Sequence, residues 1–186
     1  MGRGRERAEP QHPTSSRSGA GSRPVPTLAS ATVPRVWQGI GYRPLPDAAQ
    51  ARSLFEFAAL PWPAGRDIAF AWGASAAADA EPLVGAVVAE RSGSAVMLHG
   101  PVVTAGAVPL EIAAQLVAAA LDHATAAGTT TVFVRPQGLD RVWVRFGFIP
   151  VPESTLPAGL AGHAGVGLYA WRGGSALWTL RENATA

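Results

Sequence analysis

Residues 102–116 read VVTAGAVPLEIAAQL, which is a β-branched pair, a loop of small residues with one glycine, and a helical run opened by a proline. Pro109 suits the first position of a helix, because the N–H that proline lacks would have no partner there. A strand that turns through such a loop into a helix is a common seat for phosphate. The loop carries no Lys, Arg or Ser, so it is either an anion site built from backbone alone or a plain connection.

The rest of the composition is that of a globular protein. Of the 186 residues, 48% are hydrophobic and 15% are charged, which is enough for one domain with a core of its own. No apolar run reaches the roughly 18 residues needed to cross a bilayer, and no secretory signal opens the chain. Together with the absence of cysteine, these features predict a cytoplasmic protein that has no disulfide and does not associate with membranes.

The net positive charge of the chain comes from its N-terminal segment. Residues 1–33 hold five arginines against two glutamates, a balance of +3, whereas the rest holds ten arginines against eleven acids, a balance of −1. The segment 1–33 is rich in Arg, Gly, Ser and Pro, which predicts a disordered arm. An electrostatic tether to nucleic acid is the alternative interpretation of this arm. The body carries no clustered basic face, so nucleic acid is not an expected partner of it.

The remaining patterns predict one mixed α/β sheet. Their order is β-α-β-β-β-α-β-α-β-β, and three consecutive strands before the second helix indicate a central, mostly antiparallel sheet flanked by helices. We expect this single domain to span residues 34–172, with a tail at 173–186. The expected strands are 36–45, 66–73, 82–90, 95–103, 130–134, 148–152 and 167–172, and the expected helices are 47–60, 109–127 and a short one ending at Gly147.

That order and three local patterns resemble the GNAT superfamily of acyl-CoA-dependent N-acyltransferases, as a divergent member. The patterns are YRPLPDAAQARSLF (42–55), VVTAGAVPLEIAAQLVAAALDHATAAG (102–128) and TTTVFVRPQGLDRVWVRFGFIPV (129–151). The resemblance spans roughly residues 36–172 and implies transfer of an acetyl or other acyl group from acyl-CoA to an amine. Acetyl-CoA or another acyl-CoA is then the cosubstrate, with no metal. By the same resemblance, the acyl-CoA-binding residues are Val102, Val103, Thr104, Ala105, Gly106, Ala107 and Val108.

The chain departs from the family pattern at three places. The loop keeps one glycine and no basic side chain, where the family has an Arg or Gln and two glycines. Pro136 stands where an Asn is common, and Trp143 stands where a Tyr can serve as general acid. An indole has no proton to give near neutral pH, so that catalytic role does not carry over. A catalytically inactive GNAT-fold binding or regulatory module, and an unrelated α+β domain, therefore remain as alternatives.

Two residues are candidates for acid–base catalysis. His99 lies on the strand just before the loop, and an imidazole that titrates near neutral pH suits a general base; a hydrogen-bonded core histidine is the alternative. Glu90 ends the preceding strand, either at the mouth of a cleft or as a solvated hairpin residue. His123 is expected at the surface of its helix. The four histidines are scattered, with no two at ligand spacing, which predicts that no metal is bound.

The acceptor is an unidentified small-molecule or peptide amine. The loops 60–82 and 152–165 are rich in Ala, Pro and Gly, which favours an uncharged or hydrophobic acceptor. Trp62, between two prolines, is a candidate anchor for a lid over a cleft. Trp178 in the tail is a candidate contact with a partner, including a second copy of the chain in a homodimer. The other tryptophans are expected in the core; they are Trp37, Trp72, Trp143 and Trp171.

Overall fold

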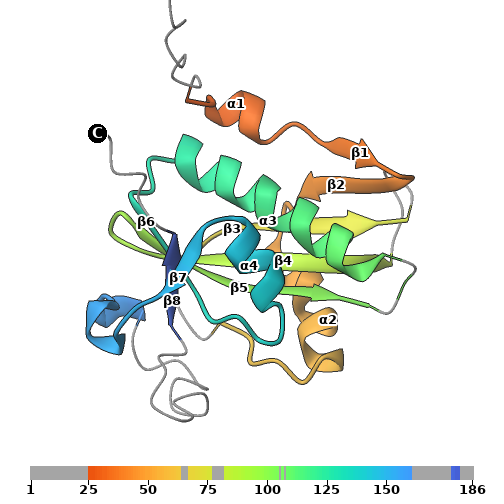
Figure 1. Ribbon diagram of the computed structural model, residues 1–186. Coiled ribbons are helices and arrows are strands. Elements are labelled where there is room, and N and C mark those ends of the chain that lie inside the picture. The colour runs from red at the N-terminus through yellow and green to blue at the C-terminus, as the bar shows by residue number, and fades with distance from the viewer. Residues whose placement is uncertain are drawn as a thin grey trace, which may run out of the picture.

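One sheet organises the part of the chain that the structure describes (Figure 1). The computed structural model describes residues 25–63, 67–76, 82–104, 106, 108–160 and 177–180. The strand order is β1-β2-β3-β4-β5-β6-β8-β7, and all neighbours are antiparallel except β5 and β6. The predicted mixed, mostly antiparallel sheet is therefore confirmed. The strands are β1 (Arg35–Trp37), β2 (Ile40–Pro44), β3 (Ile68–Ser75), β4 (Leu83–Ser92), β5 (Ala95–Val103), β6 (Thr131–Val134), β7 (Phe148–Pro150) and β8 (Trp178–Leu180).

Helices cover both faces of the sheet. Figure 1 shows α3 lying across one face, with α4 on that side, and α2 against the opposite face. The predicted helix at 109–127 is confirmed as α3, with Pro109 at its start. None of the described helices is long and apolar enough to cross a membrane. The helices are α1 (Leu28–Ala31), α2 (Arg52–Phe57), α3 (Pro109–Ala126) and α4 (Asp140–Arg145), and single 3-10 turns occupy Ala48–Ala51, Glu153–Thr155 and Ala158–Leu160.

The core is divided by the sheet. The larger part lies under α3, where the small alanines of that helix let it pack closely on Val87 of β4 and Leu98 of β5. The opposite face carries two smaller clusters. One gathers Phe55 of α2 with Val88 of β4, and the other gathers Met97 of β5 with residues near the last 3-10 turn. A cleft on this face of the sheet is lined by members of both smaller clusters, Phe55 and Met97.

The structure describes residues 25–33, which belong to the predicted arm. They include α1, where Thr27 accepts a hydrogen bond from the backbone N–H of Ser30 and caps the helix. The side chain of Ala31 is buried, and α1 packs on α3. The packing of this short helix on α3 gives residues 25–33 a fixed place beside the sheet. The rest of the predicted arm, residues 1–24, lies outside the described residues.

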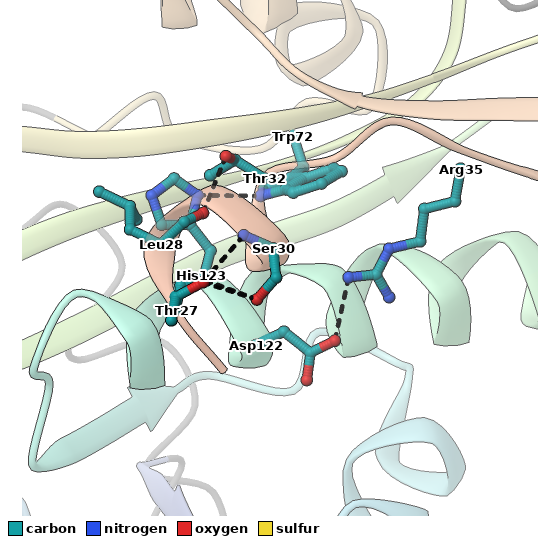
Figure 2. A network of polar contacts seen from close by, with 8 residues as sticks. All are labelled: Thr27, Leu28, Ser30, Thr32, Arg35, Trp72, Asp122 and His123. Carbon is teal, nitrogen blue, oxygen red and sulfur yellow. Dashed lines mark hydrogen bonds and ion pairs between the residues drawn. The ribbon is translucent and has the colours of Figure 1, made fainter. Parts of the chain in front are cut away.

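Polar contacts tie β1 and β3 to α3 (Figure 2). Arg35 of β1 forms an ion pair with Asp122 of α3 at 3.0 Å, and its guanidinium lies over the Trp72 ring. The indole Nε1 of Trp72 donates to Nδ1 of His123 at 3.2 Å, and the His123 ring stacks on Phe70. The expected surface position of His123 is therefore wrong, because its ring is half-buried between two aromatic side chains of β3.

The predicted first strand is in fact a hairpin. Gln38 and Gly39 both have positive φ, at 49° and 79°, and turn the chain between β1 and β2. A two-residue turn with both φ angles positive matches the twist of antiparallel strands, so the pair reverses the chain instead of continuing it. Trp37, which was expected in the core, is 48% exposed on β1 at the edge of the sheet.

A short strand that was not expected lies at the end of the described chain. Trp178–Leu180 form β8, which pairs with both β6 and β7 inside the sheet. These residues were assigned to the tail, because a three-residue strand with no alternation gives no periodic signal. Trp178 is thus partly buried against the main core. The expected strand at 167–172, with Trp171, lies outside the described residues.

Candidate functional site

The site begins at a bulge in β5. Val87 of β4 stands opposite two residues of β5, Gly100 and Pro101, so one residue of β5 is extra. Gly100 has φ of +89°, and a Cβ there would lie 2.9 Å from the backbone nitrogen of Val102 and 3.1 Å from the carbonyl oxygen of Ala86. Only glycine fits this backbone without a shift of its neighbours. The bulge therefore requires glycine at position 100.

Just before the bulge, β5 and β6 part. Their parallel register ends at Leu98 and Val134, whereas β5 continues beside β4 as far as Val103. The edge of β5 from His99 to Val103 is thus outside the ladder with β6. This edge leads from the middle of the sheet towards the loop that precedes α3.

A narrow cleft of about 30 Å³ lies where the strands part, with room for about two water molecules. Its floor is the strand β5, including His99 and Gly100. One wall comes from α2 and the segment after it, and the other comes from the segment after β6. The wall residues are Phe55, Pro61, Trp62 and Pro63 on the first side and Arg135 and Gln137 on the second.

The two candidate acid–base residues meet at this cleft. His99 lines it, and its Nε2 lies 3.0 Å from Oε2 of Glu90. The residue directly opposite Glu90 in the ladder is Met97, so His99 is its diagonal neighbour on the same face of the sheet. The side chain of Glu90 is only 2% exposed, so the expectation of a solvated hairpin residue is wrong. The buried carboxylate instead faces the imidazole, whose side chain is 14% exposed.

Arg135, which the sequence analysis did not single out, also lines the cleft. Its guanidinium donates two hydrogen bonds to the carboxylate of Glu153, at 2.7 and 2.8 Å. This bidentate hydrogen bonding lowers the pKa of Glu153 below its ordinary value. The arginine is 11% exposed and the glutamate is 41% exposed. The signal that could have found Arg135 is its place directly after β6, where the strand ends at the cleft.

The loop before α3 is described except for Ala105 and Ala107, which lie outside the described residues. Thr104 is tied to β4, because its backbone N–H and its hydroxyl both donate to the carbonyl of Val84. Val108 at the helix N-cap makes no capping hydrogen bond with its side chain. The side chain of Val102 is buried under α2, so any ligand at this residue would meet its backbone.

A basic side chain reaches the start of α3 from another helix. Arg145 in the last turn of α4 lies 3.7 Å from Glu111 in the first turn of α3. Both side chains are largely exposed, so the pair contributes little to stability. The pair places the guanidinium of Arg145 near Glu111 in the first turn of α3.

Trp143 belongs to the core and not to the cleft. Its side chain is fully buried in the cluster under α3, with its ring edge-on to Phe148 at 5.0 Å. Its indole Nε1 is buried and has no hydrogen-bond partner. The cleft opens on the other face of the sheet. Among the described residues, no three His, Cys, Asp or Glu side chains gather in a way that could hold a metal ion.

Solved structures similar to this one include acetyltransferases. A GNAT-family acetyltransferase from Staphylococcus aureus Mu50 is 13% identical with a TM-score of 0.46, and the match covers 60% of this chain and 66%, just under two thirds, of that one. An IAA acetyltransferase from Bacillus cereus ATCC 14579 is 16% identical with a TM-score of 0.47, over 61% and 79% of the two chains. A probable GNAT-family acetyltransferase from Chromobacterium violaceum ATCC 12472 is 16% identical with a TM-score of 0.46, over 77% and 86%.

No protein-family model matches the chain, and no curated protein matches it. At identities of 16% or less and TM-scores below 0.5, the likeness to these three solved structures transfers neither an activity nor a residue role. The function must therefore be derived from the residues of the cleft.

Proposed function

We propose that this chain is a GNAT-type acyltransferase that moves an acetyl or other acyl group from acyl-CoA to an amine. The observation that carries the proposal is the pairing of His99 with buried Glu90 at a cleft where β5 bulges and leaves β6. A general base must lie beside the place where two substrates meet. In the described chain, the His99–Glu90 pair lies beside a cleft at the free edge of β5. The arrangement of strands and helices agrees with the same class of enzyme.

The donor would lie along the start of α3 and the free edge of β5. The first turn of a helix offers unpaired N–H groups and about half a positive charge to a pyrophosphate. No side chain of Val108 occupies those donors, and Arg145 brings a guanidinium to the same end of the helix. The edge from His99 to Val103 supplies backbone groups for the amide-containing arm of the coenzyme. The donor-binding segment is therefore Val102–Val108, acting through its backbone.

The chemistry needs one base and a polarised carbonyl. The nitrogen of the amine attacks the thioester carbonyl carbon, so a C–N bond forms and the C–S bond breaks, with the electron pair leaving on sulfur. His99 takes the proton released from nitrogen, and the thiolate leaves as the thiol after gaining a proton from solvent. With Nε2–H donated to Glu90, the basic lone pair of the ring is on Nδ1.

Two measurements test the proposal. Calorimetry with acetyl-CoA should detect binding, and the absence of binding at concentrations on the order of hundreds of micromolar would remove the donor from the account. Mass spectrometry of a reaction with a panel of amines should detect the acylated product. Replacing Arg145 with Ala should weaken donor binding, whereas replacing Arg141, an exposed arginine near the start of the same helix, should not.

A binding module without catalysis is the second candidate. The observation that favours it is Trp143, because its buried indole leaves no acidic hydroxyl at the position where a tyrosine would act. Binding of acetyl-CoA with no product from any amine would support this second function over the first.

A further inference from the structure

The mouth of the cleft is apolar and aromatic. Pro61 is exposed, Trp62 is half-buried, and Phe55 and Met97 behind them are buried. The cleft, at about 30 Å³, has room for an aminomethyl group and little more. The body of an acceptor would therefore remain at the mouth, where the large accessible side chain is Trp62.

Trp62 is held in place by α2. Its ring stands edge-on to Phe55 at 5.2 Å with an angle of 81° between the planes. The guanidinium of Arg52 lies over the same ring, 5.2 Å from its centre. The prolines on either side of Trp62 restrict the backbone further. An aromatic wall that is fixed before binding loses little conformational entropy when a ligand packs against it.

The charges at the cleft favour an amine and disfavour an acid. Glu90 places a buried carboxylate behind His99, which attracts an ammonium group. Arg135 is the one arginine or lysine among the described lining residues, and its charge is already matched by the bidentate pair with Glu153. A carboxylate beside the amine would enter next to Glu90 and would have to compete with Glu153 for Arg135.

From this arrangement we infer that the acceptor is a primary amine on an aromatic or bulky apolar body, with no carboxylate beside the amine, and that Trp62 selects it. This inference rests on the proposed function, and it goes beyond that function by naming the class of acceptor and the residue that determines it. Trp62 contacts the body of the acceptor, while His99 handles the proton on its nitrogen.

The first test compares two amines that differ by one group. With acetyl-CoA as donor, 2-phenylethylamine should be acetylated with kcat/KM at least about a hundredfold above that of phenylalanine, because the carboxylate finds no unmatched arginine or lysine among the described lining residues. Ethanolamine, which lacks the apolar body, should also be a poor acceptor. Equal rates with phenylalanine and 2-phenylethylamine would overturn the inference while the proposed function stood.

The second test replaces the wall. Trp62→Ala should lower kcat/KM for 2-phenylethylamine by about tenfold or more, mainly through KM, and should leave ethanolamine unchanged. Trp62→Phe should retain most of the activity. Trp37→Ala is the matched control, because Trp37 is a partly exposed tryptophan on β1 at the edge of the sheet. Equal losses for both amines in the Trp62→Ala protein would contradict a selecting role. The comparison of amines uses the wild-type protein alone, so it tests the inference even if the Trp62→Ala variant does not fold.

Binding of the amine in the absence of acetyl-CoA distinguishes the proposed acyl transfer from the inferred class of acceptor. Saturation-transfer NMR with 2-phenylethylamine alone should detect binding in the wild type and a weaker signal in Trp62→Ala. Binding that depends on Trp62, with no acetyl transfer to any amine, would contradict the proposed function and support the choice of ligand class. Failure of 2-phenylethylamine both to bind and to react would overturn the inference.

Discussion

Nε2 of His99 lies 3.0 Å from Oε2 of Glu90, across neighbouring strands and on the face of the sheet opposite α3. Glu90 is buried and His99 borders the cleft. A buried carboxylate that faces one ring nitrogen fixes the orientation and the tautomer of the imidazole. In the proposed reaction the other ring nitrogen would act as the base, and the first prediction tests this role.

Removal of either member of this pair should lower kcat more than it affects donor binding. His99→Ala should reduce kcat by about a hundredfold or more, which is the usual contribution of a general base. Glu90→Gln should cause a loss of roughly ten- to hundredfold by misorienting the ring, and Glu90→Asp should recover part of it. Steady-state rates together with calorimetric affinity for acetyl-CoA check this. A Glu90→Gln protein with unchanged kcat would show that the carboxylate is only structural.

Gly100→Ala should destabilise the protein by about 3 kcal/mol or more, because the new Cβ combines strain at positive φ with contacts to two backbone atoms. Gly93 is the matched control. It also has positive φ, at 61°, but a Cβ there would meet nothing within 4 Å, so Gly93→Ala should cost only about 1 kcal/mol. Urea unfolding measures both free energies. Equal costs would mean that crowding at the bulge is unimportant.

The pair Arg135–Glu153 should contribute stability that disappears in acid. The pKa of Glu153 is lowered in the folded protein, chiefly by its hydrogen bonds with Arg135. The unfolded chain therefore binds the proton first, and the contribution is present above the unfolded pKa and lost as the pH falls through the folded pKa. Unfolding free energies between about pH 7 and about pH 3 should decline more steeply in the wild type than in Glu153→Gln. Parallel curves would contradict the role of the pair.

His123 should make the protein less stable in mild acid. Burial, with a smaller effect of Arg91, lowers the pKa of His123, so the unfolded state takes up a proton before the folded state does. Its contribution is present above the ordinary pKa of 6.5 and is lost as the pH falls towards the folded value. His123→Asn keeps an acceptor for the Trp72 indole and removes the titration. The thermal midpoint of this variant should vary less between about pH 7 and about pH 5 than that of the wild type. A variant with the same pH dependence as the wild type would locate the acid sensitivity elsewhere.

Regular elements with a strong local signal were predictable. The strand at 95–103 and the helix that starts at Pro109 agree with β5 and α3, because β-branched runs, a proline and an apolar helical face all act locally. The hairpin of β1 and β2 was not predicted, since Gln38 is an uncommon residue at positive φ. Strand β8 was missed because three residues carry no periodicity, and only pairing with β6 and β7 defines it.

The members of the site were predictable, but their geometry was not. His99 and Glu90 stood out as residue types, whereas their contact depends on the register of the hairpin, which the sequence alone did not determine. Arg135 lines the cleft and is paired with Glu153, which follows it by eighteen residues. No local sequence pattern marks such a pair. The role of Arg145 likewise depends on how α4 packs beside α3.

The central claim is that His99 is the base of an acyl transfer in the cleft. The most direct measurement is the rate of thiol release from acetyl-CoA in the presence of 2-phenylethylamine, with the acylated amine identified by mass spectrometry, for the wild type and His99→Ala. The account predicts product from the wild type and a rate lower by about a hundredfold or more in His99→Ala. Equal rates in the two proteins, or thiol release without an acylated amine, would contradict it.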